Sequence, residues 1–598
     1  MKKILFLFTL LALCLASCRH DETDVNSGNT NRETATFYLA INLSEPQSAA
    51  SRADNDSQDE ISPENIISSI RFFFFDDSGS VVKIKSGDTA TINYFEWEPE
   101  GASQPSSQAD PSSDEDDSEG LNMASSPSVL IELDAANRGQ MPKWVIAVAN
   151  SKDSNHDAIE SLENLRGLTG IYDVSQSNPY CVMSNTVYAD PSSKTLFDAV
   201  EVSGNITRDK DEARRNPLEV SLERVTAKVN LSLSSSLESQ SGNITLSDGS
   251  VLYYTGVEDD SAAGSPSDSK VYAKFLGWNL TCIPSKTFLV KHINPEWNNT
   301  DVFGSDSYNW NSTSNKRSFW AINPSLNYAD GENGDYLYGD FNNAKSYKGF
   351  GSELSPAIAY TRENASENEL LPTAHPTQLI VAAQLVNSKG EALEIAQMGT
   401  NHYTKQDLLT SLSDLANVYE VTKDNPQEGG DSGNSGATKY TKLDARYFKF
   451  VSARDAGKTT EDGGLYNAYL QLDPEAIKDK SLAMVAQGDI MEANDINQAL
   501  VASLPPVKIW TEGHTYYYID IRHLDLHDNN GTIHTTLGVV RNHVYNIKIS
   551  SIRSLGTPVF KDDEVIIPET PDGDENFMAA EINTVIWRHT SKNIQLEW

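Results

Sequence analysis

The stretch Thr36-Phe37-Tyr38-Leu39-Ala40-Ile41-Asn42-Leu43 places a large apolar side chain at every second position. Successive side chains of a β-strand point to opposite faces, so these apolar side chains would share one face and bury it in a core. The residues on that face are Phe37, Leu39, Ile41 and Leu43. We therefore predict a β-strand close to the beginning of the chain.

The residues before this strand have the pattern of a lipoprotein signal. Lys2 and Lys3 precede an apolar run, Ile4 to Ala16. The pattern Leu-Ala-Ser-Cys stands at the end of this run, at residues 15–18. Cleavage between Ser17 and Cys18 would leave Cys18 as the lipidated N-terminus, carrying acyl chains such as palmitate. The run is too short to cross a bilayer as a helix, so it indicates a signal peptide over residues 1–17.

Acidic residues follow the lipid cysteine at once. Asp21, Glu22 and Asp24 resemble the surface-export signal of Bacteroidota lipoproteins. This likeness places the precursor at the cell outer membrane, with its body outside the cell.

The predicted strand is followed by a candidate protease site. Arg52 stands in the polar stretch Ser51-Arg52-Ala53-Asp54, which is typical of a segment open to a trypsin-like protease. A cut between Arg52 and Ala53 would remove residues 18–52, and with them both the lipid and the strand. Loss of a core strand opens an apolar groove that a strand from another chain can fill. The alternative is that Arg52 is one of many arginines in an N-terminal loop.

The other end of the chain carries a second alternating segment. Its apolar residues are Val585, Trp587, Ile594, Leu596 and Trp598. This pattern predicts a strand within residues 583–598. One removable strand and one spare strand favour head-to-tail pairing, and such an interface builds an open filament when its rotation does not close a ring. The alternative is that the C-terminal strand pairs within its own sheet.

Length and charge limit the possible classes of protein. A chain of 598 residues exceeds what one core usually supports, so we expect two domains. The net charge of −38 and the isoelectric point near 4.6 argue against a nucleic-acid partner, because phosphates need clustered Lys and Arg.

The four cysteines divide into two pairs. Cys14 and Cys18 belong to the signal, whereas Cys181 and Cys282 belong to the body. The latter two could form a disulfide in an oxidising compartment or remain as two buried thiols, and we favour the thiols.

The body alternates short strands with turn residues. The segments that predict strands are 70–75, 144–149, 218–233, 515–521 and 544–552. We expect few helices: one over about 157–165, and one over about 405–419 with Thr404 as its N-cap and Asp407 as the capping-box partner. Together these patterns predict a mainly β fold of two β-sandwich-like domains.

Polar segments interrupt this pattern as long surface insertions. The segments are 98–120, 261–270 and 426–438; the first is the most acidic. A run of serines near residues 233–241 marks the expected boundary between an N-terminal domain, 53–235, and a C-terminal domain, 236–598.

The sequence gives little support for catalysis. The strong motifs of hydrolases, phosphate loops and redox dithiols are missing, so we predict that the protein is not an enzyme and needs no cofactor. Five histidines cluster in sequence: His514, His523, His527, His534 and His543. Their spacing matches no zinc pattern, and Asp528-Asn529-Asn530-Gly531 predicts a hairpin turn among them, so we expect no metal site.

Several segments taken together resemble the fimbrilins of Bacteroidota. The segments are Phe72-Phe73-Phe74-Phe75-Asp76, Val182-Met183-Ser184-Asn185, Glu223-Arg224-Val225-Thr226-Ala227-Lys228-Val229, Gly538-Val539-Val540-Arg541-Asn542-His543-Val544-Tyr545, Gly556-Thr557-Pro558 and the close from Trp587-Arg588 to Leu596. In their combined order they resemble the major subunit of the minor (short) fimbriae, a type V pilin.

This resemblance implies a fold, a maturation route and partners. The fold would be two transthyretin-like β-sandwich domains. An arginine-specific protease would cut the lipoprotein precursor, and residues 583–598 of a neighbouring subunit would replace the strand at 36–43. The product would be an extracellular homopolymer, a fimbrium with accessory tip and anchor proteins, that supports adhesion to a host or bacterial surface and biofilm formation.

A second function remains open at this point. The chain could instead be a surface lipoprotein that stays anchored through Cys18 and binds glycans or host proteins without polymerising. Its candidate binding residues are the tryptophans Trp278, Trp297, Trp310 and Trp320. Tryptophans at such positions are more often core residues.

Overall fold

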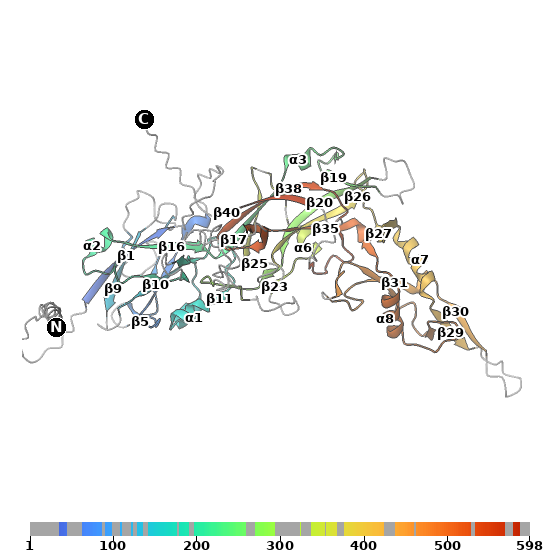
Figure 1. The fold of residues 1–598 in the computed structure, drawn as a ribbon, viewed down its shortest axis with the longest axis horizontal. Helices are drawn as coiled ribbons and strands as arrows, with labels where there is room; N and C mark the ends of the chain where they lie inside the picture. The colour runs from blue at the N-terminus through green and yellow to red at the C-terminus, as the bar shows by residue number, and fades with distance from the viewer. Residues whose placement is uncertain are drawn as a thin grey trace, which may run out of the picture.

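The computed structural model describes a mainly β protein, as the sequence predicts. The described residues are 35–44, 63–86, 90–98, 108–109, 121–122, 128–135, 141–175, 179–189, 196–258, 270–292, 323–324, 336–347, 349–352, 354–366, 376–423, 437–459, 462–527, 533–567 and 578–586. They form an elongated body with β1 near one end and helices α7 and α8 toward the other (Figure 1).

The N-terminal sheet is built around the strand that the sequence singles out. Its order is β6-β3-β10-β12-β16-β1-β9-β7, with β15 paired to β10 off this path. The strands are β1 (Ala35–Ser44), β3 (Ile70–Phe75), β6 (Phe95–Trp97), β7 (Gln108–Ala109), β9 (Ser128–Ala135), β10 (Trp144–Ala149), β12 (Met183–Asn185), β15 (Val200–Glu201) and β16 (Leu218–Arg224). β7 is a short strand inside the segment predicted to be a loop, whereas Asp110 to Asp117 lie outside the described part.

Strand β3 is buried on both of its faces. Phe72 and Phe74 pack into one apolar core together with β1, while Phe73 and Phe75 pack into a second core on the other face. This double burial explains why the sequence Ile-Arg-Phe-Phe-Phe-Phe shows no polar alternation. The strand predicted at 70–75 is thus confirmed as a central element.

The chain passes to a second sandwich through two consecutive strands, β16 and β17 (Thr226–Leu233), which are separated by Val225. Leu222 of β16 packs in the N-terminal core, and Ala227 of β17 packs in the next one. The alternating segments predicted around Arg224 are therefore two strands that serve two cores. The domain limits near residue 235 stay a prediction.

Two facing sheets form the second sandwich. One has the order β24-β17-β38-β40, the other β18-β19-β20-β26-β35-β39. Their strands are β18 (Ile244–Thr245), β19 (Val251–Glu258), β20 (Lys270–Thr281), β24 (Ala357–Arg362), β26 (Gln378–Val386), β35 (His514–Asp520), β38 (His543–Ile552), β39 (Thr557–Pro558) and β40 (Met578–Ile586). Alternate residues of both sheets meet in one core, which includes Trp278, Tyr517 and Ile547.

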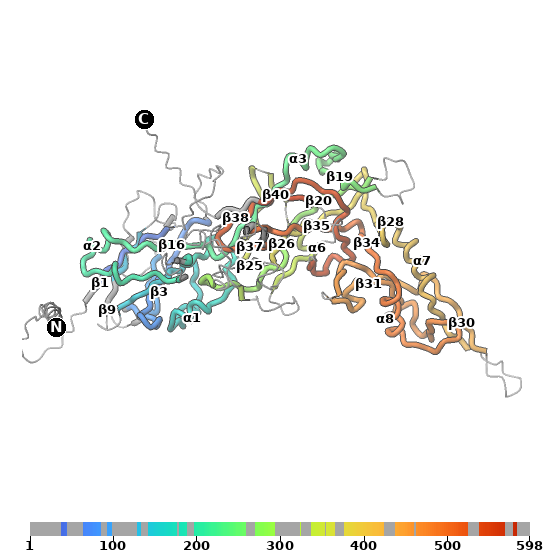
Figure 2. The backbone as a smooth tube through the Cα atoms, viewed as in Figure 1, coloured from blue at the N-terminus to red at the C-terminus, as the bar shows by residue number. Residues whose placement is uncertain are grey.

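A third core lies between β26 and β35 in the chain. Leu408 and Leu412 of α7 (Lys405–Ala416) pack there with Ile496 and Leu500 of α8 (Ala493–Ser503). Strand pairs complete it: β29 (Tyr419–Lys423) with β30 (Thr438–Lys442), and β31 (Phe448–Ser452) with β32 (Ala468–Leu472). The tube view shows this part extending away from the second sandwich (Figure 2). No pattern in the sequence predicted a separate core here.

The two predicted helices have different outcomes. Thr404 caps α7 as predicted, since its hydroxyl accepts the Asp407 amide at 3.2 Å; the helix ends three residues early because Asn417 adopts the left-handed conformation. The helix predicted over 157–165 is wrong in its bounds. Ser161 is extended and caps a short helix, α1 (Leu162–Arg166), so residues 154–158 form a separate 3₁₀ turn.

Four further helices occur in the described chain, none of them predicted. They are α2 (Lys210–Arg215), α3 (Ser235–Glu238), α6 (Phe341–Ser346) and α8. Each is short, and the first three are capped by Asp209, Ser234 and Asp340.

The two body cysteines are not joined to each other. Both are buried, and burial raises the pKa of each thiol to about 12. A thiol so hard to ionise is a poor nucleophile, so these residues act as small core side chains.

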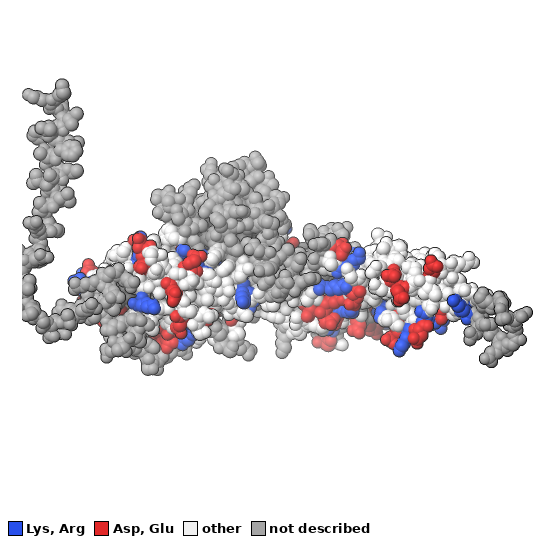
Figure 3. Space-filling view, turned by 90° about the horizontal axis from the view of Figure 1, so that it is seen from below, with Lys and Arg blue, Asp and Glu red and all other residues white. Residues whose placement is uncertain are grey.

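The surface agrees with the acidic composition. In the face shown in Figure 3, acidic and basic side chains are interspersed, and no continuous basic stripe crosses the described residues. No helix of the described chain is long and apolar enough to cross a membrane.

Candidate strand-exchange site

Strand β1 has partners along both of its edges. It runs antiparallel to β9 over Ala35–Asn42 and parallel to β16 over Ile41–Ser44. A strand paired on both sides is an internal strand, so its backbone groups are satisfied by the two neighbours.

The inner face of β1 is fully buried. Leu39, Ile41 and Leu43 are each 0% exposed, and Phe37 packs against the same core at its margin. Burial of a Leu or Ile side chain contributes about 1.5–3 kcal/mol. The face that the sequence predicts is therefore the core face.

The outer face of β1 is covered by a helix. Ala40 packs with Leu130 of β9 and Ala213 of α2, and Tyr38 lies against this small cluster. Ala40 and Ala213 are both buried, so the helix approaches the strand closely. β1 is thus enclosed on two faces as well as on two edges.

The segment before α2 extends the pairing beyond the end of β16. The Tyr38 amide donates to the Thr207 carbonyl at 2.7 Å, and the Thr207 amide donates back at 3.1 Å. The Arg208 guanidinium lies 5.6 Å from the centroid of the Phe37 ring, within cation–π range. These contacts hold the first half of β1, where β16 does not reach.

Polar side chains fix the second half of β1. The Asn42 side-chain amide donates to Glu219 at 2.7 Å, and the hydroxyls of Ser44 and Ser221 are 3.0 Å apart. These contacts lie on the parallel pairing with β16, so they help set its register.

This geometry determines what removal of β1 would expose. β16 and β9 would each present unpaired backbone donors and acceptors, with an apolar floor between them. Such a gap is a site for β-augmentation, in which main-chain hydrogen bonds supply affinity and side-chain pockets supply specificity.

Sequence reasoning identified the strand but missed what encloses it. Thr207, Arg208 and α2 carry no alternation or motif that links them to β1. The only local signal was Asp209 before Lys210-Asp211-Glu212, which is a helix start.

The C-terminal strand β40 pairs within its own sheet over its described length. Met578–Ile586 runs antiparallel to β38, with Val585 opposite Val544. Residues 583–586 of the predicted donor therefore take the alternative pairing. Trp587, Ile594, Leu596 and Trp598 are beyond the described residues.

The predicted processing positions also fall beyond the described chain. They are Ser17, Cys18, Arg52 and Ala53. The segment that contains Arg52 connects β1 to the residue at which description resumes, Pro63.

Residues considered for other kinds of site have structural roles where they are described. Trp278 is fully buried, and its indole donates to the Gly349 carbonyl at 3.1 Å, so it belongs to the core.

His523 and His543 pack edge to face, with the Tyr545 hydroxyl 2.8 Å from His523 Nδ1. No group of metal-ligating residues occurs in the described chain. Strands β36 (Arg522–His527) and β37 (Ile533–Val539) pair antiparallel, as a hairpin requires, and the predicted turn, residues 528–531, lies outside the described residues.

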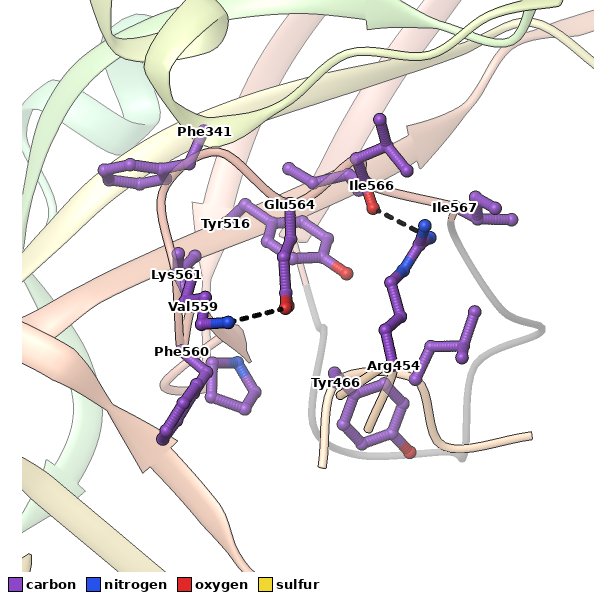
Figure 4. A pocket seen from close by; sticks show the side chains of 13 residues that line it. Phe341, Arg454, Tyr466, Tyr516, Val559, Phe560, Lys561, Glu564, Ile566 and Ile567 are labelled. Carbon is purple, nitrogen blue, oxygen red and sulfur yellow. Dashed lines mark hydrogen bonds and ion pairs between the residues drawn. The ribbon is translucent and has the colours of Figure 1, made fainter. Parts of the chain in front are cut away.

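One pocket lies where the β39–β40 connection meets the third core (Figure 4). Arg454 donates to the Val565 carbonyl at its rim, and Lys561 lies 4.0 Å from Glu564. Its cavity of about 40 Å³ has room for two or three waters, far less than the 300–1,000 Å³ of a typical ligand pocket. It therefore does not fit a substrate.

The fold and the candidate site define a class: an elongated, mainly β protein whose early strand is internal to its sheet. Residues 508–593, which span β34 (Lys508–Trp510) to β40, match the family described as "Major fimbrial subunit protein type IV, Fimbrillin, C-terminal". The predicted resemblance to the fimbrilins is thereby confirmed. No curated protein matches the chain.

Solved structures of fimbrial proteins align with the chain at low similarity. A fimbrilin from Porphyromonas gingivalis aligns at 11% identity and a TM-score of 0.33, covering 92% of this chain and 97% of that one. The tip fimbrial protein Mfa3 from the same organism aligns at 9% identity and 0.30, covering 92% and 100%. A fimbrial assembly protein from Parabacteroides distasonis aligns at 11% and 0.24, covering 75% and 98%. Scores this low carry no argument about the fold, so the resemblance rests on the family match over residues 508–593.

Proposed function

We propose that this chain is a structural subunit of a surface fimbria that polymerises by strand exchange. The family match supports a fimbrial subunit and a structural, non-enzymatic role. The observation that carries the finer mechanism is the placement of β1: it is internal to its sheet, yet only the segment with Arg52 connects it to the rest of the chain.

In this proposal maturation has two cuts. Signal cleavage leaves Cys18 lipidated at the outer membrane, and an arginine-specific protease then cuts between Arg52 and Ala53. β1 leaves its groove between β16 and β9, and the C-terminal segment 583–598 of a neighbouring subunit takes its place. Repetition of this step builds an extracellular homopolymer. Accessory tip and anchor proteins complete the fimbria, which supports adhesion and biofilm formation.

The energetics favour a durable polymer. An incoming strand would bury three apolar side chains at the positions of Leu39, Ile41 and Leu43, worth about 1.5–3 kcal/mol each, and ladder hydrogen bonds would add about 0.5–1.5 kcal/mol apiece. Dissociation would require all of these contacts to break together, so it would be slow.

Limited trypsin treatment of the purified precursor tests the proposal. We expect a cut after Arg52, mapped by N-terminal sequencing, and a ladder of multimers on an unboiled detergent gel. Arg52→Ala is expected to give a folded monomer and no ladder. Arg52→Lys, which trypsin still cuts, restores the ladder, and Arg446→Ala at an exposed arginine leaves it unchanged.

Truncation after Lys592 tests the donor separately. The truncated chain is expected to accept a strand from full-length subunits but not to donate one, so it should shorten the ladder when mixed with them. A normal ladder from the truncated chain alone, or from Arg52→Ala, would contradict the mechanism.

A further inference from the structure

The chain is pinned down immediately after the segment that the proposed cut would sever. The first described elements after β1 are the 3₁₀ turn η1 (Pro63–Asn65) and strand β2 (Ile66–Ile67). Glu64 is 8% exposed and Asn65 6%, although acids and amides of this size are mostly found at the surface. Burial of both side chains in succession calls for specific partners.

Glu64 is held by the sheet of the second sandwich. Lys228 Nζ of β17 lies 2.9 and 3.1 Å from its two carboxylate oxygens, and the Tyr360 hydroxyl of β24 donates to the same carboxylate. Three charge-assisted hydrogen bonds thus connect the Glu64 side-chain carboxylate to β17 and β24.

Arg224, the last residue of β16, bonds to both Glu64 and Asn65. Its Nη2 donates to Asn65 Oδ1 at 2.6 Å, and its Nε donates to the Glu64 carbonyl at 3.2 Å. Its Nη1 reaches Asn542 Oδ1 at 3.2 Å, just before β38. One buried guanidinium therefore links η1 to the start of β38.

The backbone that follows is fixed by the N-terminal sandwich. The Asn150 side chain donates to the Ile66 carbonyl at 2.7 Å and accepts the Ser68 amide at 2.7 Å. β2 also pairs antiparallel with β8 (Leu121–Asn122). The hydrogen bonds described above for Glu64, Asn65 and Ile66 run to Arg224, Lys228, Tyr360 and Asn150, which belong to the two sandwiches.

We propose that Glu64 and Asn65 form a retaining clamp for the processed N-terminus. The clamp ties the chain from residue 63 onward to both sandwiches, so β1 can leave without fraying the strand that follows, β3. The proposal rests on the proposed removal of β1, since only then does residue 63 lie near a new chain end. It assigns these buried polar residues a role in keeping the strand-accepting state folded.

The arrangement of trypsin sites allows a direct readout. After Arg52 the next Lys or Arg is Arg71, in β3, where it is 9% exposed and bonded to Glu96 at 2.9 Å. Trypsin can cut at Arg71 only if β3 opens. Cleavage at this position therefore reports fraying past the clamp.

The test compares the double variant E64Q/N65L with wild type. Amide hydrogen exchange of the intact chain is expected to rise at least tenfold over Ile66–Phe75 and to stay within twofold over β1. After trypsin treatment the variant should be cut at Arg71, whereas the wild-type product keeps its N-terminus at Ala53. The variant N65D, which still accepts from Arg224, is expected to behave as wild type.

A matched control uses the same two residue types at an exposed turn. Asn387 donates to Glu391 at 2.7 Å there, and its Oδ1 accepts the amides of Lys389 and Glu391. E391Q/N387L therefore removes a Glu–Asn contact and a local turn outside the clamp, and it should change neither readout. If the double variant does not fold, Tyr360→Phe removes one bond to Glu64 and should raise exchange over Ile66–Phe75 about threefold.

Two results would overturn the clamp. One is exchange over Ile66–Phe75 within twofold of wild type in every clamp variant. The other is an equal rise over β1, which would mean general destabilisation. If trypsin does not cut at Arg52 in any variant, the proposed maturation fails, but exchange in the intact chain still decides whether the clamp exists.

Discussion

Strands β1 and β40 have similar alternating sequences but occupy different positions in their sheets. β1 lies between β16 and β9, with a core on one face and α2 on the other. β40 is the last strand of its described sheet and pairs with β38 alone. Its Ile582 is half-buried, whereas Ile41 of β1 is fully buried.

The difference shows which strand the fold depends on. Loss of an internal strand leaves two edges and an open core, a state that is stable only when another strand enters. Loss of an edge strand leaves one edge and a partly covered face. This asymmetry is what a strand-exchange polymer needs, because the gap must require filling and the donor must be able to leave its own chain.

Truncation of one isoleucine in each strand sharpens the comparison. We expect Ile41→Ala to lower the free energy of unfolding by about 3 kcal/mol, because it leaves a cavity in a closed core. Ile582→Ala should lower it by about 1 kcal/mol, because part of that side chain is already in contact with water. Urea unfolding of the two purified precursors measures both values. Equal losses would mean that the two strands are equivalent.

Acid should lower the stability of the folded chain through one buried histidine of the N-terminal sandwich, His156. Burial, reinforced by the Arg71 guanidinium, lowers the pKa of His156 to about 4. Below pH 6.5 the unfolded chain takes up a proton that the folded chain excludes, so this histidine's contribution is complete above pH 6.5 and is lost as the pH falls to 4. The loss amounts to about 3 kcal/mol.

His156→Gln should therefore remove this part of the pH dependence. Urea midpoints of variant and wild type are expected to converge between pH 6.5 and 4, with wild type losing more stability over that range. His402→Gln, at a partly exposed position, serves as the control. Parallel curves for His156→Gln and wild type would contradict the prediction.

The smallest expected effect concerns the start of β1. Arg208→Ala removes a cation–π contact at an exposed position, which is worth about 0.5–1 kcal/mol. We expect exchange to increase for the amides of Phe37 and Tyr38 and not for those of β40. A change of the same size in β40 would show that the effect is not local.

The sequence predicts individual strands well where one strong pattern decides them. Alternation located β1 and β38 because burial of one face of a strand makes every second residue apolar, and a continuous apolar run located β3 because both of its faces are buried. The capped helix at Lys405 was equally readable because Thr404 and Asp407 form a local pair.

What could not be predicted depends on contacts between distant residues. The enclosure of β1 by Thr207 and α2 joins positions about 170 residues apart, and no local pattern encodes that pairing. The third core arises because α7 and α8, each only weakly amphipathic, pack together across short strands. Ser161 divided a predicted helix because a cap stabilises a new start more than continuation.

A reversible lock on β1 tests the central claim most directly. Asn42 and Ser128 are opposed in the β1–β9 pairing, so cysteines at these positions (N42C/S128C) can form a disulfide that joins the two strands. The chain used has Cys14 and Cys18 replaced by serine. T422C/K439C is the matched lock between β29 and β30, away from both β1 and the donor segment. After trypsin treatment, we predict only monomer from the oxidised β1 lock, a multimer ladder once it is reduced, and a ladder from the control in both states. A ladder from the oxidised β1 lock as strong as that from its reduced form would contradict strand exchange at this site.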